Sequence, residues 1–276
     1  MSGFLEQMAA ASAARVRAAK ARVAEAALLE RAQHTPAPPP LRLAADGFDL
    51  IAELKLRSPA AGALGAVDAL VAAHVTAYAH AGAAAVSVLT EPTRFDGSLT
   101  HLTDAASALA PHHVPAMRKD FLVDPYQVLE ARAAGAGGVL LILRMLSRET
   151  LGALIECART QGLFVLLEAF DAQDLEHMGE IVAADAGRSA LLAGVNCRDL
   201  ATLEVVPERL LELAPLLPRA VPQVAESGVA DAEDARRLAA AGYRLILVGS
   251  ALMRDQDPVG LARALIEAGR AARRTS

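Results

Sequence analysis

The sequence predicts an α/β fold, a (β/α)8 TIM barrel with an N-terminal helical extension. Eight short apolar runs recur after residue 48, segments with helical spacing of apolar residues separate them, and polar side chains stand at the ends of most runs. Alternating strands and helices are typical of a parallel sheet built from βαβ units. An open doubly wound sheet would use the same units, but the count of eight favours the closed barrel.

The helical extension is expected over residues 1–47. Residues 5–34 are rich in Ala, Arg and Glu with scattered Leu and Val, which predicts one or two helices. The stretch Thr35–Pro40 ends this region because proline cannot continue a helix. It is too short to separate independent domains, so we expect a single domain with the barrel over residues 48–276.

The barrel elements follow in order. Strands are expected at Leu50–Leu56, Ala84–Thr90, Val114–Phe121, Gly138–Leu143, Phe164–Phe170, Leu191–Asn196, Pro222–Ser227 and Leu245–Gly249, where Val, Ile and Leu gather. Helices are expected between them, chiefly at Ala66–Ala81, Pro125–Ala134, Arg148–Gln161, Ala172–Ala184 and Ala232–Ala241.

The composition excludes several classes of protein. With 54% apolar residues and a net charge of −5, the chain is neither disordered nor a broad nucleic-acid binder. The histidines and the two cysteines show no metal-ligand spacing, and no apolar run has the ~18 residues of a membrane span. We expect a cytoplasmic protein that binds no metal, membrane or nucleic acid, and a monomer, with a weak homodimer as the alternative.

Polar side chains at the strand ends predict a functional site. In a barrel the carboxyl ends of all strands face one mouth, whereas in an open sheet they are spread along an edge. Glu53 and Lys55 are two residues apart and therefore point to the same side of the first strand. Burying both inside a barrel costs several kcal/mol unless they are paired or functional.

Two strand ends predict an anion site. Glu226-Ser227-Gly228 closes the seventh run and Gly249-Ser250 closes the eighth, and a helical segment follows each. The loops after strands seven and eight of such barrels often bind phosphate through backbone N–H groups and a helix N-terminus. An ordinary turn between strand and helix is the alternative for each pair taken alone.

Lys119 and Glu168 are the candidates for acid–base chemistry. Lys119 ends the third run, and Glu168 ends the fifth after apolar residues. A buried lysine with a lowered pKa can act as a general acid or form a Schiff base, and a carboxylate in apolar surroundings suits proton exchange. A structural ion pair is the alternative, which convergence with Glu53 and Lys55 disfavours.

Three further residues are candidates for binding a substrate. Asn196 offers a donor and an acceptor, Arg198 has a planar fork that matches a carboxylate, and Phe95 can stack on a planar ring. Arg198 could instead pair locally with Asp199, and Phe95 could anchor its loop on the barrel rim.

Several motifs occur together in this chain. The most specific are Arg118-Lys119-Asp120-Phe121 with Asp124-Pro125-Tyr126-Gln127, and Asn196-Cys197-Arg198-Asp199-Leu200. The others are Ile51-Ala52-Glu53-Leu54-Lys55 with Ser58-Pro59, Phe95-Asp96-Gly97-Ser98, Ala225-Glu226-Ser227-Gly228, and Val248-Gly249-Ser250-Ala251. With these motifs the chain resembles the indole-3-glycerol-phosphate synthase family over nearly its whole length.

The resemblance implies a tryptophan-pathway enzyme that needs no cofactor or metal. Such enzymes close the ring of 1-(2-carboxyphenylamino)-1-deoxyribulose 5-phosphate with loss of CO2 and water. By position, Lys119 resembles the general acid, Glu168 its carboxylate partner, and Glu53 with Lys55 a pair used in dehydration; which lysine acts in which step stays open. Implied substrate contacts are Ser58, Phe95, Phe121, Asn196, Arg198 and Glu226, and the implied phosphate cradle is Ser227, Gly228, Gly249 and Ser250.

The chain also departs from the family pattern. The extension has no Trp to cap an aromatic pocket, so that Phe4 is the nearest candidate, and Arg144-Met145 follows the fourth strand where small or apolar residues are usual. These departures leave open a paralogue that acts on a substituted anthranilate-derived substrate in secondary metabolism.

Two further functions share the predicted fold. One is a phosphate-binding barrel isomerase, which typically uses a Cys/Asp or Asp/Asp pair, and the other is a barrel kept as a binding subunit.

Overall fold

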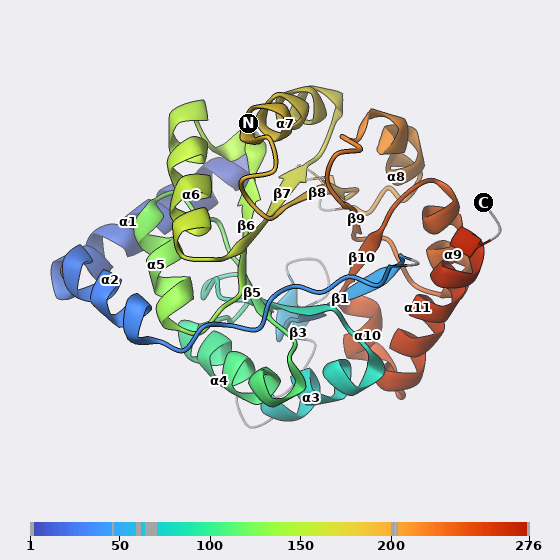
Figure 1. Cartoon of the computed structure of the whole chain (residues 1–276), viewed down its shortest axis with the longest axis horizontal. Helices are drawn as coiled ribbons and strands as arrows, with labels where there is room; N and C mark the ends of the chain where they lie inside the picture. The colour runs from blue at the N-terminus through green and yellow to red at the C-terminus, as the bar shows by residue number, and fades with distance from the viewer. Residues whose placement is uncertain are drawn as a thin grey trace.

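The structure is a closed barrel of parallel strands surrounded by helices (Figure 1). The computed structural model describes residues 3–45, 47–58, 62, 63, 71–199, 202 and 204–274, without the side chains of residues 58, 62 and 63. The barrel strands follow the order β1-β10-β9-β8-β7-β6-β5-β4, and β4 closes the ring onto β1. This confirms the predicted (β/α)8 TIM barrel.

The barrel strands lie in the eight predicted runs. They are β1 (Asp49–Leu54), β4 (Ala85–Leu89), β5 (Ala116–Lys119), β6 (Gly138–Ile142), β7 (Phe164–Ala169), β8 (Leu191–Asn196), β9 (Gln223–Glu226) and β10 (Leu245–Val248). Most end one or two residues before the predicted limit, where the chain leaves the sheet for the loops at the mouth. A short antiparallel pair, β2 (Arg57–Ser58) with β3 (Gly62–Ala63), was not expected.

The five predicted outer helices are present. They are α3 (Val71–Ala81), α5 (Pro125–Ala133), α6 (Arg148–Thr160), α7 (Ala172–Asp185) and α9 (Ala232–Ala240), and residues 66–70 lie outside the described part. Helices α4 (Leu99–Leu109), α8 (Glu208–Leu213), α10 (Ser250–Arg254) and α11 (Pro258–Arg274) are additional, with single turns η1 (Ala110–His112), η2 (Leu143–Met145) and η3 (Ala214–Leu216). Several starts are capped by Ser or Asp side chains, as at Ser98 and Asp171.

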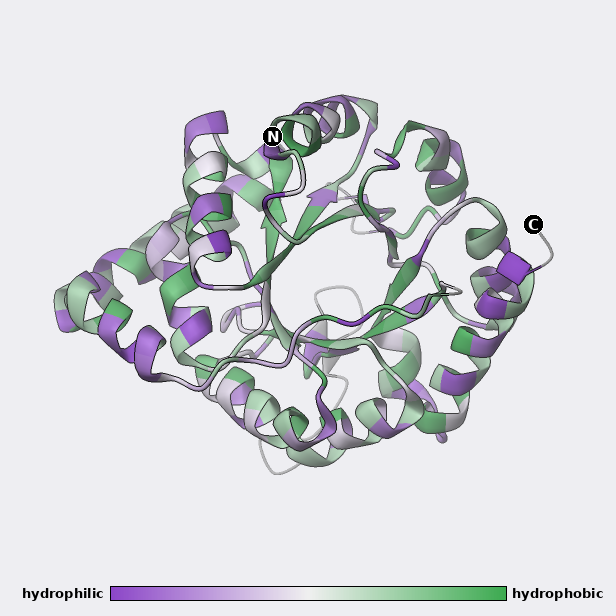
Figure 2. Cartoon of the chain, in the orientation of Figure 1, coloured by the Kyte–Doolittle hydropathy of each residue, from purple (hydrophilic) through white to green (hydrophobic). Residues whose placement is uncertain are grey.

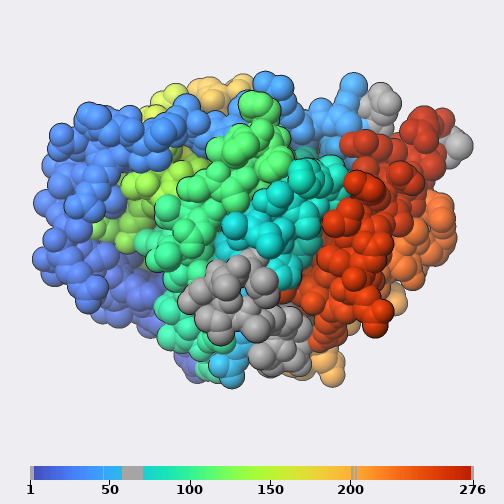
Figure 3. All heavy atoms as spheres, turned by 90° about the horizontal axis from the view of Figure 1, so that it is seen from below, coloured from blue at the N-terminus to red at the C-terminus, as the bar shows by residue number. Residues whose placement is uncertain are grey.

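The N-terminal extension forms two helices on one side of the barrel. Helices α1 (Gly3–Arg22) and α2 (Glu25–His34) lie beside α5, as the blue and green segments of Figures 1 and 3 show. Val16 and Leu28 pack against Tyr126 of α5, whose hydroxyl donates to the carbonyl of Val23 at 3.0 Å. The start of α1 contributes Leu5 to the core inside the barrel, so the extension reaches the pocket described below.

Alternation along each strand separates two apolar layers. On β1, Leu50, Ala52 and Leu54 face the surrounding helices, whereas Ile51 faces the barrel interior. Figure 2 shows the strands as a mostly hydrophobic ring, with the hydrophilic faces of the helices outermost. Glu53 shares the inward side with Ile51, so a charged group enters an apolar interior.

None of the helices in the described part of the chain is long and apolar enough to cross a membrane.

Candidate active site

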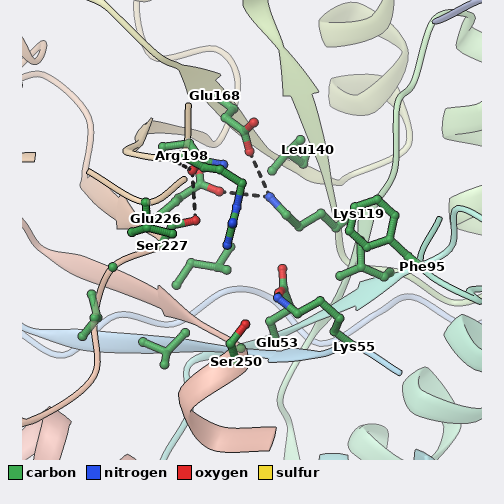
Figure 4. A pocket seen from close by; sticks show the side chains of 18 of the residues that line it. Glu53, Lys55, Phe95, Lys119, Leu140, Glu168, Arg198, Glu226, Ser227 and Ser250 are labelled. Atoms are coloured by element: carbon green, nitrogen blue, oxygen red, sulfur yellow. Dashed lines mark hydrogen bonds and ion pairs between the residues drawn. The ribbon is translucent and has the colours of Figure 1, made fainter. Parts of the chain in front are cut away.

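A pocket of about 370 Å³ opens at the carboxyl ends of the barrel strands (Figure 4). The four residues expected to carry acid–base chemistry line it together: Glu53 and Lys55 at the end of β1, Lys119 on β5 and Glu168 on β7. It also brings together Phe95, Phe121, Asn196, Arg198, Glu226, Ser227, Gly228, Gly249 and Ser250. The side chain of Ser58 lies outside the described residues.

Lys119 links two carboxyl groups across the mouth. Its Nζ donates to Oε2 of Glu168 at 2.9 Å and to Oε2 of Glu226 at 3.1 Å. Burial alone would lower the pKa of this ammonium, but the carboxylates of Glu168, Glu226 and Glu53 outweigh burial and raise it. The lowered pKa considered from the sequence is therefore wrong, because the acidic neighbours favour the charged form of Lys119. A charged ammonium suits a general acid or an oxyanion partner.

Glu226, at the end of β9, is only 1% exposed. Burial raises its pKa well above the usual value; Lys119 opposes this rise and the neighbouring Glu168 adds to it. Its buried Oε1 has no hydrogen-bond partner within the described chain. This oxygen lies against Gly194, where any Cβ would clash with it. The site therefore contains a carboxyl group that keeps its proton to higher pH than an ordinary glutamate.

Glu53 and Lys55 form a second ion pair, on the wall below Lys119 in Figure 4. Nζ of Lys55 donates to Oε1 of Glu53 at 2.7 Å, and both side chains are buried. Burial acts to raise the pKa of Glu53, but the charges of Lys55 and Lys119 outweigh it, so the pKa is lowered. Lys55 lies one residue beyond β1 and stays beside Glu53, as the two-residue spacing predicted. A Cβ at Gly249 would clash with the Glu53 carboxylate, which explains the glycine there.

The residues predicted to hold phosphate lie at the ends of β9 and β10. Ser227 (φ 68°) and Gly228 (φ 70°) both have left-handed backbone, which turns the chain sharply after the strand. The Ser227 hydroxyl donates to Oδ1 of Asn196 at 2.9 Å. Gly249 precedes α10 and Ser250 begins it, so the first N–H groups of this turn have no partner within the helix. Backbone N–H groups and hydroxyls in this arrangement suit a phosphoryl group.

Arg198 extends from the loop after β8 into the pocket (Figure 4). Its backbone N–H donates to Oδ1 of Asn196 at 3.0 Å, which fixes the start of this loop. The carboxylate of Asp199, the local partner considered from the sequence, lies 3.7 Å from Nη2 of Arg209. The Arg198 side chain itself lines the pocket.

Three phenylalanines form the apolar end of the pocket. The ring of Phe121 lies 5.9 Å from that of Phe4, edge to face, and 6.3 Å from that of Phe95. Phe4 comes from α1, so the helical extension closes this end. Phe4 was the residue expected to cap the pocket, because the extension has no Trp. Leu140 and Ile142 of β6 continue the apolar wall and were not singled out from the sequence. Such a wall accommodates a flat aromatic group.

A sequence model of the family described as indole-3-glycerol phosphate synthase matches residues 5–265. The indole-3-glycerol phosphate synthase of Parafrankia sp. (strain EAN1pec) is 44% identical over 246 residues, which cover 88% of this chain and 88% of that protein. The enzyme of the same name from Mycolicibacterium vanbaalenii is 40% identical over 256 residues, covering 92% and 90%. The chain belongs to the indole-3-glycerol phosphate synthase family.

This membership confirms the resemblance and the function predicted from the sequence. The matches do not support the isomerase or the secondary-metabolism paralogue. Among solved structures, 3-hexulose-6-phosphate synthase from Salmonella typhimurium has a TM-score of 0.61 at 17% identity, covering 81% of this chain and 99% of that one. Thiamine phosphate pyrophosphorylase from Pyrococcus furiosus has a TM-score of 0.56 at 16% identity, covering 82% and 96%. At such identities the likeness shows the barrel fold alone.

Asp120 connects the pocket of this indole-3-glycerol phosphate synthase family member to α1. Its carboxylate accepts two hydrogen bonds from Arg15, at 2.7 and 3.0 Å, one from Thr90 at 2.8 Å and one from Arg118 at 3.1 Å. Burial would raise the pKa of Asp120, but Arg118 and Arg15 lower it to about 2. Asp120 stands between Lys119 and Phe121 in the chain, so this network fixes the strand end that carries both.

Arg144, in the single turn after β6, packs on a residue that lines the pocket. Its Nε donates to Oδ2 of Asp174 at 2.8 Å, and its Nη2 also contacts Asp171. The guanidinium lies 4.8 Å from the ring centre of Phe170, which lines the pocket. The acidic partners thus hold this arginine outside the polar centre.

In the described part of the chain, no three His, Cys, Asp or Glu side chains are placed to share a metal ion.

Proposed function

We propose that this chain closes the ring of 1-(2-carboxyphenylamino)-1-deoxyribulose 5-phosphate and releases CO2 and water to give indole-3-glycerol phosphate. The family and its named relatives support this activity. The observation that carries the proposal is the position of Lys119, whose ammonium stands between a phosphate cradle and an aromatic wall in one pocket. The chain is, on this proposal, a carbon–carbon lyase of the carboxy-lyase type.

The two ends of the pocket set the orientation of the substrate. Its phosphate would occupy the cradle of Ser227, Gly228, Gly249 and Ser250, and its aromatic ring would lie among Phe4, Phe95 and Phe121. The ribulose chain then spans the mouth, with its carbonyl near Lys119. Arg198 offers its guanidinium to the ring carboxylate.

Ring closure is assigned to Lys119. When the ring carbon attacks the carbonyl carbon, the electron pair of the C=O bond moves to oxygen, and Nζ of Lys119 supplies a proton to it. The Glu168 carboxylate, 2.9 Å away, orients Nζ and stabilises the positive charge that develops on the ring. Glu226 holds a proton that can return to Lys119 for the next step, since burial raises its pKa.

Loss of CO2 restores the aromatic ring. The bond between the ring carbon and the carboxyl carbon breaks, and its electron pair returns to the ring. Leu140 and Ile142 give the carboxylate an apolar surrounding on one side, which favours its departure as neutral CO2.

Dehydration is assigned to the second ion pair. The hydroxyl formed in ring closure leaves as water with a proton from Lys55. Glu53 accepts a proton from the neighbouring CH2 carbon, and the new double bond completes the indole. The lowered pKa of Glu53 keeps this carboxylate ionised and ready to act as a base.

The activity is tested by incubating the purified chain with the carboxyphenylamino deoxyribulose phosphate. Indole fluorescence should appear, and one CO2 should be released for each indole formed. An isomerase would consume the substrate without releasing CO2, and such a result would overturn the proposal, as would the absence of turnover.

A further inference from the structure

A second cleft opens at the other end of the barrel, where the strands begin. It has a volume of about 750 Å³ and lies between the starts of β9 and β10, the end of α9, the turn η3 and the last turn of α11. Figure 1 shows α8, β9, α9 and α11 together on the orange-to-red side of the barrel. The substrate pocket lies at the opposite ends of the same strands, so the two cavities share no lining residue.

Three arginines line this cleft, namely Arg219, Arg244 and Arg273. No aspartate or glutamate lines it among the residues that the structure describes. The whole chain has a net charge of −5, so this is a local concentration of positive charge. Asp49, at the start of the neighbouring strand β1, is already engaged by Nη2 of Arg270 at 2.8 Å. Among the described residues, the cleft is therefore lined by cations with no facing carboxylate.

Backbone contacts hold two of these arginines in place. Nη2 of Arg244 donates to the carbonyl of Ala44 at 3.1 Å, while its buried Nε has no partner within the described chain. Nη1 of Arg273 donates to the carbonyl of Tyr243 at 3.1 Å. Burial, and then the charge of Arg244, lower the pKa of Arg273, so the two guanidinium groups repel one another. A bound anion would relieve this repulsion.

We propose that this cleft binds a small molecule that carries a phosphate group. Guanidinium groups donate pairs of hydrogen bonds that match phosphate oxygens, and three of them offset a doubly charged group. Leu217, Val221 and Pro222 line the same cleft and give the carbon part of a phosphate ester an apolar contact. The volume of about 750 Å³ is that of a small-molecule site. This site does not depend on the reaction assigned to the substrate pocket.

Binding is measured by calorimetric titration of the full chain with phenyl phosphate and, separately, with inorganic phosphate. Because the substrate pocket also suits phosphate, Ser250→Glu is introduced to repel anions from its cradle. We expect this variant still to bind a single equivalent of the probe. Tighter binding of phenyl phosphate identifies phosphate esters as the ligand class, and equal binding identifies the free anion; both outcomes support the site.

Adding Arg219→Gln to the Ser250→Glu variant tests the location. Arg219 is exposed, so the fold should survive, and we expect binding to weaken about tenfold. Arg17→Gln makes the same change of charge at an exposed position on α1 and should leave binding unchanged. Amide NMR signals of Ala220, Gln223 and Gly242 should shift during the titration. Absence of binding to Ser250→Glu, equal affinity after Arg219→Gln, or shifts confined to the substrate pocket would overturn the proposal.

Discussion

Nζ of Lys119 lies 2.9 Å from Oε2 of Glu168, with both side chains largely buried at the mouth of the barrel. Such a pair is stable only while its charges match, because an uncompensated buried charge is costly. Transfer of a proton from Lys119 to a substrate would leave Glu168 as such a charge. Glu226, 3.1 Å from the same nitrogen and with a raised pKa, provides a nearby proton that restores the balance.

Replacing Lys119 should stop the reaction at its first step. In Lys119→Ala the developing oxyanion loses its proton donor, so we expect kcat to fall by about 10³-fold or more. In Lys55→Ala the ring should still close and lose CO2, but dehydration should fail. Parallel measurements of CO2 release and indole fluorescence distinguish the two steps. Lys20→Ala, which loses an ion pair with Asp124 outside the pocket, is the control and should turn over normally. Near-normal turnover of Lys119→Ala would refute its assignment.

The two carboxyl partners of Lys119 should differ in their tolerance of an amide. Glu168→Gln removes the charge that stabilises the ring cation, and we expect at least about a tenfold fall in kcat. Glu226→Gln keeps a neutral group of the same shape but cannot return a proton to Lys119. Water must then return it, and we expect a smaller fall in kcat, about threefold. Steady-state kinetics at neutral pH, with circular dichroism to check folding, measures both. The reverse order of effects would contradict the roles given to the two residues.

Local periodicity was enough to predict the barrel and which charged residues meet at its mouth. Parallel strands of a barrel end at one mouth, so Lys119 and Glu168 were expected to meet, and the two-residue spacing of Glu53 and Lys55 set them on one side. Helix α4 was not predicted, although Ser98 caps it, because it directly follows the loop that carries Phe95.

Contacts between distant segments could not be read from the sequence. Arg15 and Asp120 meet across 105 positions, and neither position shows a pattern that predicts the other. The sequence predicted the wrong direction for the pKa shift of Lys119 for the same reason. The direction depends on how many carboxylates surround Nζ, and burial alone would lower the pKa.

Gly249 should be needed because of its contact with Glu53. The Cβ of Gly249→Ala would clash with the Glu53 carboxylate, so the carboxylate must move away from Lys55. We expect kcat to fall about tenfold, since misplaced acid–base groups lose much of their effect. Gly152→Ala, on α6 where no atom lies within 4 Å of the new Cβ, is the matched control. It should keep full activity, and equal activity of both variants would contradict this account of the glycine.

Phe4 should contribute to substrate binding and leave the chemical steps unaffected. Its ring packs edge to face on Phe121 and closes the aromatic end of the pocket. Phe4→Ala removes this contact, and we expect KM to rise about three- to tenfold with little change in kcat. Leu216→Ala, at an exposed apolar position on η3, is the control and should change neither constant. A large fall in kcat without a change in KM would show that Phe4 does something else.

Asp120 should make the stability of the protein depend on pH in the acid range. Its pKa is about 2 when folded and 3.8 in the absence of structure, so the folded state favours the ionised form. The stabilisation is fully present above pH 3.8 and is lost as the pH falls through the folded pKa; it amounts to about 2 kcal/mol.

Asp120→Asn should therefore lower the free energy of unfolding at pH 7 and flatten its decline between about pH 4 and pH 2. Urea denaturation at a series of pH values, followed by circular dichroism, measures this difference. Asp104→Asn, at an exposed position on α4, should keep the wild-type profile. If Asp120→Asn unfolds in parallel with the wild type over this range, the bridge from Arg15 does not stabilise the fold, and α1 must be held by its other contacts with α5.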